Sequence, residues 1–417
     1  MSEISIIGAT FYGNRGAEAM LSTTIGRLRE THPDTMFNVF SYYAQQDRQL
    51  VGDPAIRFYS SSPAYLVAVL NPFALLYGLL GLLRLRPLQR LCPQSVQALA
   101  RSRALVCLAG VSFVDGRTKF LPFNIATILP AMLVGTPVVK FAQALGTFTE
   151  MPNRLAARMF LPLCRRVFAR GAGTLENLRG LLGEAPNVER ANDVAFLFSP
   201  DLSLSRRDET GFAEGIAAMR ARRNDGTVVV GLCPSVVVAK KARKAGWDYA
   251  AMLADIVRAA TGRGWAVALF PNATRSEPDV EHNNDLPLLK DVLSRLSAGE
   301  RERVIPFTGL VNAAQVHEVI ATCDVVLVSR FHAMVGALSI GVPVAVMGWS
   351  HKYREVMELF GQEDMVLRYE KGEAADVLAG LGDLVVQREA RAAAIAAAAP
   401  AVRTLSRRQL DYVAALL

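Results

Sequence analysis

Aromatic residues and paired cysteines are both scarce in this chain of 417 residues. Phe, Trp and Tyr together make up 8% of it, and it carries no nucleic-acid-binding motif, so we predict no nucleic-acid partner. The five cysteines are odd in number, lie far apart in apolar runs and form no C-x-x-C pair. This argues against a zinc ribbon and against a disulfide framework. The cysteines are Cys92, Cys107, Cys164, Cys233 and Cys323.

Several catalytic signatures are missing as well. The sequence has no G-x-S-x-G elbow, H-E-x-x-H pair, P-loop or EF-hand, so the serine hydrolase, zincin, NTPase and calcium-binding classes lack support. His332 and His351 share no ligand spacing with Cys or Asp, so we expect neither a catalytic metal nor a resident cofactor. The chain opens on a predicted strand without the basic stretch and apolar core of a signal peptide, which predicts a cytoplasmic protein.

The composition that is present indicates a folded, basic protein. Hydrophobic residues make up 51% of the chain and charged residues 20%, which excludes a disordered protein. The length suits two domains better than a single core. The net charge is +8, and such a field attracts phosphorylated substrates, nucleic acid or an acidic membrane surface. Most basic residues are scattered, and the one real cluster runs from Lys240 to Lys244.

Short apolar runs alternate with amphipathic stretches of helical length, a pattern typical of parallel sheets with crossover helices. In the first half we predict strands over 3–8, 36–41, 104–109, 137–141 and 166–169, and helices over 16–30, 120–134, 153–165 and 174–182. In the second half the predicted strands are 227–233, 265–270, 303–307, 324–329 and 343–347, and the helices are 248–262, 285–298, 312–322, 332–340 and 351–360.

This order predicts an α/β protein with two Rossmann-like, doubly wound domains. The first covers 1–205, a polar linker covers 206–226, the second domain covers 227–385, and helices over 386–417 end the chain. Within the last part, Pro400 should separate an Ala-rich helix from a final one. Two such domains with a terminal helix suggest the GT-B arrangement of glycosyltransferases, in which ligands bind at the carboxyl ends of the strands.

Three predicted strand exits carry polar residues that suit ligand binding. Asn14, Arg15 and Glu18 follow a glycine-containing turn that opens a helix, where they either bind a sugar or merely shape a tight turn. Ser112 lies in a small-residue loop that a plain strand exit explains equally well. Asn272 follows the strand over 265–270, with loop polarity alone as the alternative. Further polar residues come after it, namely Arg275, Asn284 and Asp285.

The sharpest signal is Ser329-Arg330-Phe331-His332. It follows an apolar strand and opens a helix, so a cation, a ring nitrogen and free backbone N–H groups converge on one point. A lone histidine is more often structural, but Arg330 two residues away favours an anion site. We predict Arg330 and His332 as the catalytic pair, with Ser329 beside them in substrate binding.

Taken together, these segments resemble the polysaccharide pyruvyl transferase family from the first strand to about residue 360. The most specific segment is SRFHA at 329–333, before GVP at 341–343. Arg170 falls where members often carry arginine. The other matching segments are GNRGAEA at 13–19, AGVSFVD at 109–115, FAQALG at 141–146 and NDVAF at 192–196.

The resemblance implies a GT-B-like fold and transfer of a pyruvyl group from phosphoenolpyruvate to sugar hydroxyls as a ketal. It associates Arg330 and His332 with phosphoenolpyruvate, and an imidazole that titrates near neutral pH suits proton delivery. The acceptor would be a cell-surface polysaccharide or its lipid-linked precursor. A nucleotide-sugar glycosyltransferase and a non-enzymatic sugar-binding protein stay open as alternatives, and so does an oligomeric state.

The apolar excess gathers in 64–83, which has no charged residue and is followed by Arg84, Arg86 and Arg90. Its length is that of a membrane span, but one crossing would divide the first domain between two sides of the bilayer. Pro72 is expected to split the stretch into two short halves. Two interpretations remain. Either the segment is buried against the first domain or an oligomer partner, or it anchors the protein peripherally at the inner face of the membrane.

Overall fold

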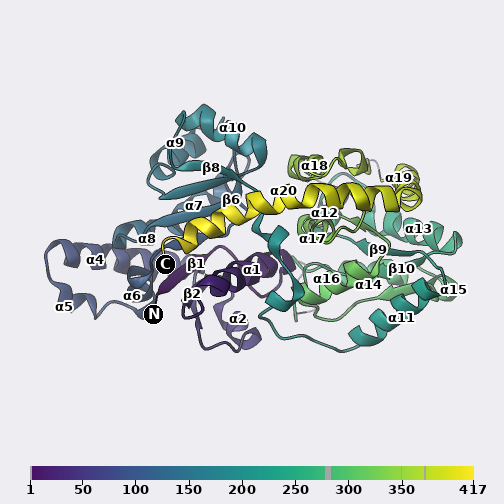
Figure 1. Cartoon of the computed structure of the whole chain (residues 1–417), viewed down its shortest axis with the longest axis horizontal. Coiled ribbons are helices and arrows are strands. Elements are labelled where there is room, and N and C mark those ends of the chain that lie inside the picture. The colour runs from purple at the N-terminus through teal and green to yellow at the C-terminus, as the bar shows by residue number, and fades with distance from the viewer. Residues whose placement is uncertain (1, 278–282, 349, 371) are drawn as a thin grey trace. The chain divides into compact units, whose positions relative to one another are not determined.

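The computed structural model describes residues 2–277, 283–348, 350–370 and 372–417 (Figure 1). The chain forms two compact units. Unit 1 comprises residues 1–11, 20–197 and 403–417, and unit 2 comprises residues 12–19 and 198–402. We call residues 12–19, a turn together with the first residues of the helix that follows it, the 12–19 loop; they belong to unit 2 although they lead from the first strand of unit 1.

Unit 1 is built on a parallel sheet with the strand order β3-β2-β1-β4-β6-β7-β8, and β5 pairs with β6 off this path. Most residues of its inner strands are buried, as expected for a sheet that helices cover on both faces. The strands are β1 (Glu3–Ile7), β2 (Met36–Ser41), β3 (Ile56–Ser60), β4 (Leu105–Cys107), β5 (Val111–Val114), β6 (Val138–Gly146), β7 (Arg166–Arg170) and β8 (Val188–Ala191).

The helices of unit 1 divide between the two faces of this sheet. The chain moves from β1 to β3 in one direction and then from β3 through β4 to β8 in the other. Since parallel crossovers are right-handed, α1 (Arg15–Thr31) and α2 (Ala44–Leu50) cover one face. The later helices follow on the other side, and all of them except the short α5 contribute to one apolar core. They are α4 (Asn71–Leu82), α5 (Arg86–Gln89), α6 (Gln94–Arg101), α7 (Leu121–Ala126), α8 (Leu129–Val134), α9 (Met151–Phe160) and α10 (Gly171–Leu182).

Unit 2 has a five-stranded parallel sheet with the order β11-β10-β9-β12-β13. Its strands are β9 (Val229–Cys233), β10 (Ala266–Leu269), β11 (Val304–Pro306), β12 (Val325–Val328) and β13 (Val344–Val346). Its helices are α11 (Phe212–Asn224), α12 (Val236–Lys244), α13 (Tyr249–Gly262), α14 (Leu286–Ser294), α15 (Ala298–Arg301), α16 (Ala313–Thr322), α17 (Phe331–Ser339), α18 (His351–Glu358) and α19 (Ala375–Val386). The strand order reverses between β9 and β12, which makes their carboxyl ends the switch point of the sheet.

The predicted α/β class with two doubly wound sheets is confirmed, and so are the predicted strands. The sequence interpretation missed β3, β5 and β8, which are short and carry polar residues. It was wrong about Pro400, because α20 (Arg388–Ala414) continues through it. The proline ring is exposed, and the alanines before it favour a helix strongly enough to tolerate one missing hydrogen bond.

The unit boundaries differ from those expected. The expected linker over 206–226 contains α11, whose Phe212 packs on Phe307 of unit 2. The expected C-terminal helical part over 386–417 is not separate, since α20 gives residues up to 402 to unit 2 and residues from 403 to unit 1. In unit 1, Gln409 accepts a hydrogen bond from the backbone N–H of Ala142 in β6, which fixes the end of the chain on that sheet.

The apolar segment forms one helical stretch from Pro63 to Leu82, so Pro72 does not divide it. The stretch begins with α3 (Pro63–Tyr65), passes through one π-helical turn (Leu66–Leu70) and continues as α4. Pro72 is tolerated because it lies in the first turn of α4, directly after the wider turn. By length and composition alone this stretch could cross a membrane, which is weak evidence for a span.

Candidate active site

The candidate site lies at the switch point of unit 2, where the carboxyl ends of β9 and β12 meet. The backbone N–H of Ser329 donates to the carbonyl of Cys233, so the two strand exits are tied together. α12 begins after Ser235, whose hydroxyl accepts from the N–H of Val237 and caps the helix. α17 begins at Phe331, so both helices direct their N-terminal N–H groups toward this edge of the sheet.

Asp285 is fully buried and connects the chain segments that meet at this edge of the sheet. One carboxylate oxygen accepts from the N–H of Val236 at 3.0 Å, and the other accepts from the N–H of Ala273 at 3.0 Å. These two backbone groups follow β9 and β10. The same carboxylate binds the guanidinium of Arg330, which follows β12, at 2.5 Å. One buried carboxylate thus fixes three strand exits.

Arg330 is held on two sides. Its Nε and Nη2 donate to Asp285, and its Nη1 donates to the side-chain oxygen of Asn283 at 2.9 Å. Burial alone would lower the pKa of this guanidinium, but the charge and hydrogen bonds of Asp285 outweigh burial and raise it. Arg330 is therefore a fixed cation, and the Nη1 edge beside Asn283 is the part that Asp285 does not occupy.

His332 stands in the first turn of α17 and is half-buried. Gly16 of the 12–19 loop lies directly against its ring, since a β-carbon at position 16 would be 2.1 Å from the Nδ1 atom. The backbone N–H of Arg15 donates to the carbonyl of Asn272 at 3.1 Å and fixes this loop on unit 2. Sequence segments more than 300 positions apart therefore meet at His332.

The three residues predicted in this loop make contacts inside the protein. The side-chain oxygen of Asn14 accepts from the N–H of Gly16 at 3.0 Å, so it caps α1. Arg15 pairs with Glu18 at 2.9 Å, and the side chain of Glu18 has no exposed surface. Ser205 donates a hydrogen bond to the same carboxylate. Glu18 is thus enclosed, which speaks against direct contact with a sugar hydroxyl.

Two of the other predicted substrate-binding residues also belong to this site, and one does not. Ser329 is buried and shares a hydrogen bond of 2.7 Å with the hydroxyl of Tyr249. Asn272 is buried and fixes the 12–19 loop through its carbonyl. Ser112 lies in unit 1, where its hydroxyl donates to the side chain of Gln143 at 2.6 Å. The structure therefore brings Ser329 and Asn272 together with Arg330 and His332, whereas it assigns Ser112 to the other unit.

Two pockets flank the basic helix α12. The first, of about 330 Å³, is lined by Asn283, which also binds Arg330, and by lysines and valines of α12. The second, of about 380 Å³, lies between α12 and α18. Lys241 lines both. The α12 residues of the first pocket are Val236, Val237, Lys240, Lys241 and Lys244.

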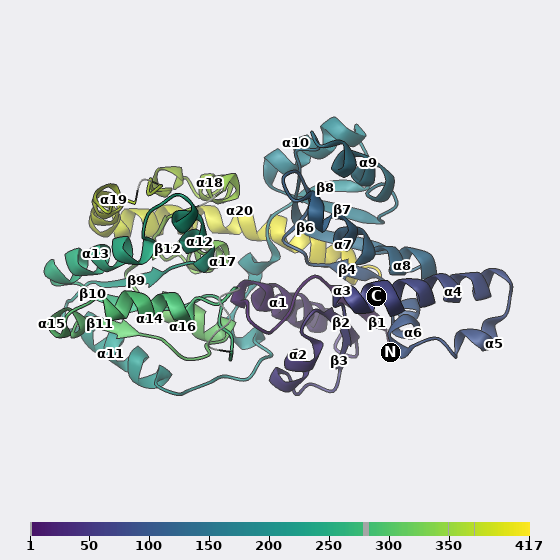
Figure 2. The same ribbon diagram turned by 180° about the vertical axis from the view of Figure 1, so that it is seen from behind.

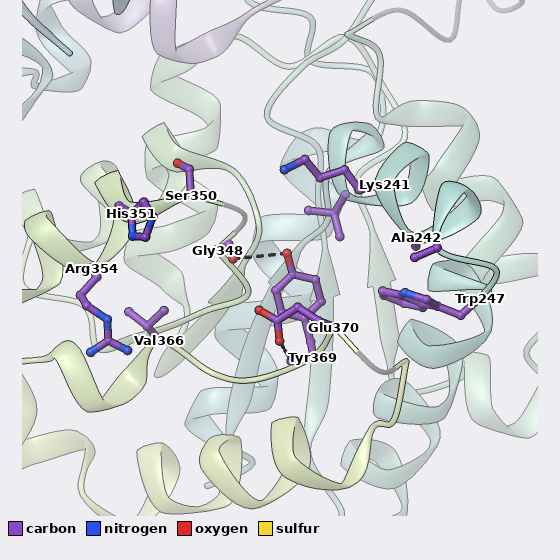
Figure 3. Close-up of a pocket in the computed structure, with 12 residues that line it drawn as sticks. Lys241, Ala242, Trp247, Gly348, Ser350, His351, Arg354, Val366, Tyr369 and Glu370 are labelled. Atoms are coloured by element: carbon purple, nitrogen blue, oxygen red, sulfur yellow. Dashed lines mark hydrogen bonds between the residues drawn. The ribbon is translucent and has the colours of Figure 1, made fainter. Parts of the chain in front are cut away.

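The second pocket combines aromatic and cationic side chains (Figure 3). Tyr369 lies between Trp247 on one side and His351 with Arg354 on the other. The Tyr369 hydroxyl donates to the carbonyl of Gly348 at 3.3 Å, and burial raises the pKa of this phenol to about 12. The ring is therefore a fixed and neutral part of the pocket lining, whose charged side chains are Lys241, Arg354 and Glu370.

The described residues contain no group of three or more His, Cys, Asp or Glu side chains that could hold a metal ion. All five cysteines are buried and free. Burial raises the pKa of the Cys164 thiol to about 12 and that of Cys92 above its ordinary value, so these two behave as small apolar residues.

The model of one protein family, described as polysaccharide pyruvyl transferase, matches residues 14–351. The chain belongs to this family. The match begins beside Gly16, which contacts His332, and ends at His351, so it includes Asp285, Arg330 and His332 but not the far side of the second pocket, where Arg354 and Tyr369 lie. No curated protein matches the chain.

Solved structures similar to this family member share its fold at low identity. MnaA of S. aureus, solved with UDP, is 12% identical with a TM-score of 0.60, and the alignment covers 100% of this chain and 98% of that one. UDP-GlcNAc 2-epimerase of Neisseria meningitidis, bound to UDP-GlcNAc, is 13% identical with a TM-score of 0.54 and 99% coverage of both. HepE of Anabaena, with UDP and glucose, is 15% identical with a TM-score of 0.52 and coverage of 100% and 98%. These likenesses confirm the GT-B fold class.

The sequence interpretation missed the residues around the two pockets. It noted the Lys240–Lys244 cluster and the polar Asp285, but it did not connect either with Arg330. Asn283, Trp247 and Arg354 carried no pattern that marks a site. The signal that could have linked them is topological, because the exits of β9, β10 and β12 must meet at the switch point of the sheet.

Proposed function

We propose that this chain transfers the pyruvyl group of phosphoenolpyruvate to sugar hydroxyls of a cell-surface polysaccharide or of its lipid-linked precursor. The observation that carries the proposal is the fixed cation Arg330, beside a pocket that three lysines line, at the switch point of unit 2 in a member of this family. Phosphoenolpyruvate carries a phosphate and a carboxylate, and it needs such an array of cations.

The contacts of Arg330 define how the donor would bind. Asp285 occupies Nε and Nη2, so an incoming anion meets the Nη1 edge and takes the place of the Asn283 oxygen. Lys240 and Lys244 line the adjacent pocket and supply further positive charge. Each charge-assisted hydrogen bond contributes about 1.5–3 kcal/mol, so two or three of them give a substantial affinity.

The reaction conserves atoms without a redox partner. One sugar hydroxyl oxygen bonds to C2 of phosphoenolpyruvate while the C3 methylene takes a proton and becomes a methyl group. The bond between C2 and the phosphate oxygen then breaks, and phosphate leaves. A second hydroxyl oxygen bonds to C2 and closes the ketal. The two sugar hydroxyls release two protons. One accounts for the proton added to the new methyl group, and the other accounts for the proton taken up by the departing phosphate.

His332 is the proposed proton donor. It follows Arg330 by two residues, so an anion bound at the guanidinium lies within one helical turn of the imidazole. Gly16 limits the positions that the ring can take, since it packs against the Nδ1 side. Holding an acid in one position relative to the substrate is a large part of acid catalysis.

A nucleotide-sugar glycosyltransferase is the second candidate, and the pocket between α12 and α18 favours it. Trp247 and Tyr369 offer aromatic surface, while Lys241 and Arg354 offer positive charge for a diphosphate. If this pocket serves pyruvyl transfer instead, the same side chains suit the saccharide acceptor and its phosphate carrier.

Calorimetric titration of the full chain with phosphoenolpyruvate, and separately with UDP-glucose, tests the proposal. We expect phosphoenolpyruvate to bind and a Lys240→Gln/Lys244→Gln variant to weaken it, since these lysines line the first pocket only. A matched His351→Gln/Arg354→Gln variant changes the second pocket only and should retain phosphoenolpyruvate binding. Tight binding of UDP-glucose with none of phosphoenolpyruvate would favour the glycosyltransferase, and binding of neither would favour a sugar-binding protein.

A further inference from the structure

α4 of unit 1 has an inner side that packs on the core, where Phe73, Tyr77 and Leu80 are partly buried, and an outer side of exposed leucines. Only Leu66, Leu70 and Ala74 of the stretch from Pro63 to Leu82 are buried, and they hold its inner side on the core. Only 17% of its most apolar 18-residue window is buried. The exposed leucines at and just after α4 are Leu75 (49% exposed), Leu76 (42%), Leu79 (47%), Leu82 (79%) and Leu83 (66%).

α9 repeats this arrangement independently. Met151, Leu155 and Met159 are spaced by four residues, so they form one stripe along the helix, and Leu163 extends it. All four are more than half exposed. The opposite side of α9 is buried through Ala156 and Ala157, so the exposed stripe is a consistent feature of the helix and not a frayed end.

The two helices belong to one layer. α4 packs on α8, α8 on α7, and α7 on α9, as Figure 2 shows along unit 1. The direction in which the chain crosses the sheet puts them on the same face. We call the exposed side chains of 67–91 and 151–165 the α4–α9 face.

The charge on this face has a single sign. The sequence contains no Asp or Glu between Asp53 and Asp115, and none between Glu150 and Glu176. Exposed arginines accompany each apolar helix. Leucines lie between the arginines that follow α4. These arginines are Arg84, Arg86 and Arg90 after α4, Arg154 and Arg158 on α9, and Arg165 beyond its end.

Sheet pairing rules out a transmembrane crossing for α4. β1 precedes it and β4 follows it, yet Ser5 pairs with Leu105 in the same sheet. A crossing would put these two strands on opposite sides of a bilayer. The stretch can therefore meet a membrane only along its side, with the inner edge still packed on unit 1.

We propose that the α4–α9 face docks in the plane of an anionic phospholipid bilayer, with the leucines and methionines among the acyl chains and the arginines at the headgroups. A second copy of the chain fits less well, because pairing this face with itself would bring arginines against arginines. The proposal rests on exposure and charge and does not require phosphoenolpyruvate as donor. If the proposed function holds, docking would concentrate the protein on the membrane that holds lipid-linked acceptors.

Vesicle co-sedimentation of the full chain tests this proposal. The wild type should sediment with phosphatidylglycerol-containing vesicles and much less with pure phosphatidylcholine. Leu75→Gln/Leu79→Gln/Leu82→Gln should abolish sedimentation, because glutamine keeps the helix but removes the apolar side chains. Arg84→Gln/Arg86→Gln/Arg90→Gln leaves the apolar side chains in place and should weaken binding about 5-fold per arginine, roughly 100-fold in all.

A matched control replaces exposed apolar residues of unit 2, with Leu310→Gln/Val386→Gln, and should sediment like the wild type. Calorimetry with phosphoenolpyruvate should be the same for all these variants, which separates a failure of docking from a failure of the proposed function. A wild type that stays in the supernatant with both vesicles overturns the proposal. If it is then a dimer that the leucine variant converts to a monomer, the face is an interface between copies.

Discussion

Gly16 and His332 are in direct contact, and the contact leaves no room for a side chain at position 16. A β-carbon there would lie 2.1 Å from Nδ1 and 2.2 Å from Cγ of the imidazole. Both residues belong to unit 2 although the chain between them exceeds 300 residues. The glycine of the first strand-to-helix turn thus sets the position of the proposed proton donor.

Replacing this glycine should therefore impair turnover more than folding. In Gly16→Ala the ring must move, and displacement of a catalytic group by about 1 Å can lower a rate about 100-fold. We expect kcat to fall on that scale while circular dichroism shows a folded chain. Steady-state release of phosphate from phosphoenolpyruvate measures kcat.

Gly180→Ala is the matched control. Gly180 also lies in a helix, but a β-carbon there would have nothing within 4 Å, so alanine should leave turnover unchanged and favour the helix by up to about 1 kcal/mol. If Gly16→Ala turns over like Gly180→Ala, His332 does not take part in the reaction.

Arg330→Lys should weaken phosphoenolpyruvate binding about 10- to 150-fold. The lysine ammonium can pair with Asp285, but it lacks the second N–H edge that the arginine guanidinium presents to an anion. Arg330→Ala is a poorer test because it leaves the Asp285 carboxylate buried without its cation, which can cost about 3–5 kcal/mol of stability. Calorimetric titration measures the affinity of the lysine variant.

Arg391→Lys provides the comparison. Arg391 is buried and pairs with Asp364 at 2.6 Å, so this change disturbs an ion pair of the same unit outside the proposed site. It should leave phosphoenolpyruvate affinity unchanged. Equal loss of affinity in both variants would mean that binding responds to the stability of unit 2 and not to the guanidinium of Arg330.

His332→Gln should lower kcat far more than it lowers phosphoenolpyruvate affinity. General acid catalysis contributes about 100- to 10,000-fold to a rate, whereas the amide of glutamine can still donate a hydrogen bond to the bound anion. Glutamine retains a polar side chain beside Gly16 but cannot donate a catalytic proton. A variant with intact kcat and much weaker binding would make His332 an anion ligand and not the acid.

His317 should make the protein less stable in mild acid. It is buried in α16 against Phe198, and burial lowers its pKa from 6.5 to about 4. Between these values the unfolded chain binds a proton that the folded chain excludes, so the free energy of unfolding falls as pH drops from 6.5 to 4. The loss reaches about 3 kcal/mol and vanishes above pH 6.5.

Urea denaturation of the wild type and of His317→Met across this pH range measures the effect. Methionine is apolar and flexible enough to fill the site, and it does not titrate. The variant should lose about 3 kcal/mol less than the wild type between pH 6.5 and 4. Parallel pH profiles for the two proteins would contradict the assignment.

The sequence was sufficient for the two sheets because apolar strands such as Val325–Val328 carry strong local signals. It was insufficient for elements whose stability comes from packing. The edge strand β8 is half charged, and α11 shows almost no separation of apolar and polar faces, yet Phe212 fixes it on unit 2. The prediction at Pro400 was wrong because the rule that proline ends a helix was given more weight than the helix preference of the alanines before it.

The sequence was likewise sufficient for one part of the candidate site and insufficient for the rest. Arg330 and His332 were predicted because they stand together after a strand. Their partners could not be found by spacing, since Asp285 and Gly16 reach them only through the fold. Polarity at a strand exit also proved ambiguous: Asn14 caps a helix and Glu18 is enclosed by Arg15 and Ser205.

The fate of the C3 carbon of phosphoenolpyruvate tests whether this molecule is the donor. The full chain is incubated with 3-¹³C-phosphoenolpyruvate and the lipid-linked saccharide fraction of its source cells, and the saccharide is examined by ¹³C NMR. We expect a labelled methyl carbon in a saccharide ketal and the release of one phosphate per ketal. His332→Gln should give no signal from a labelled ketal methyl. Unchanged phosphoenolpyruvate, together with sugar transfer from UDP-glucose to the same fraction, would contradict this proposal.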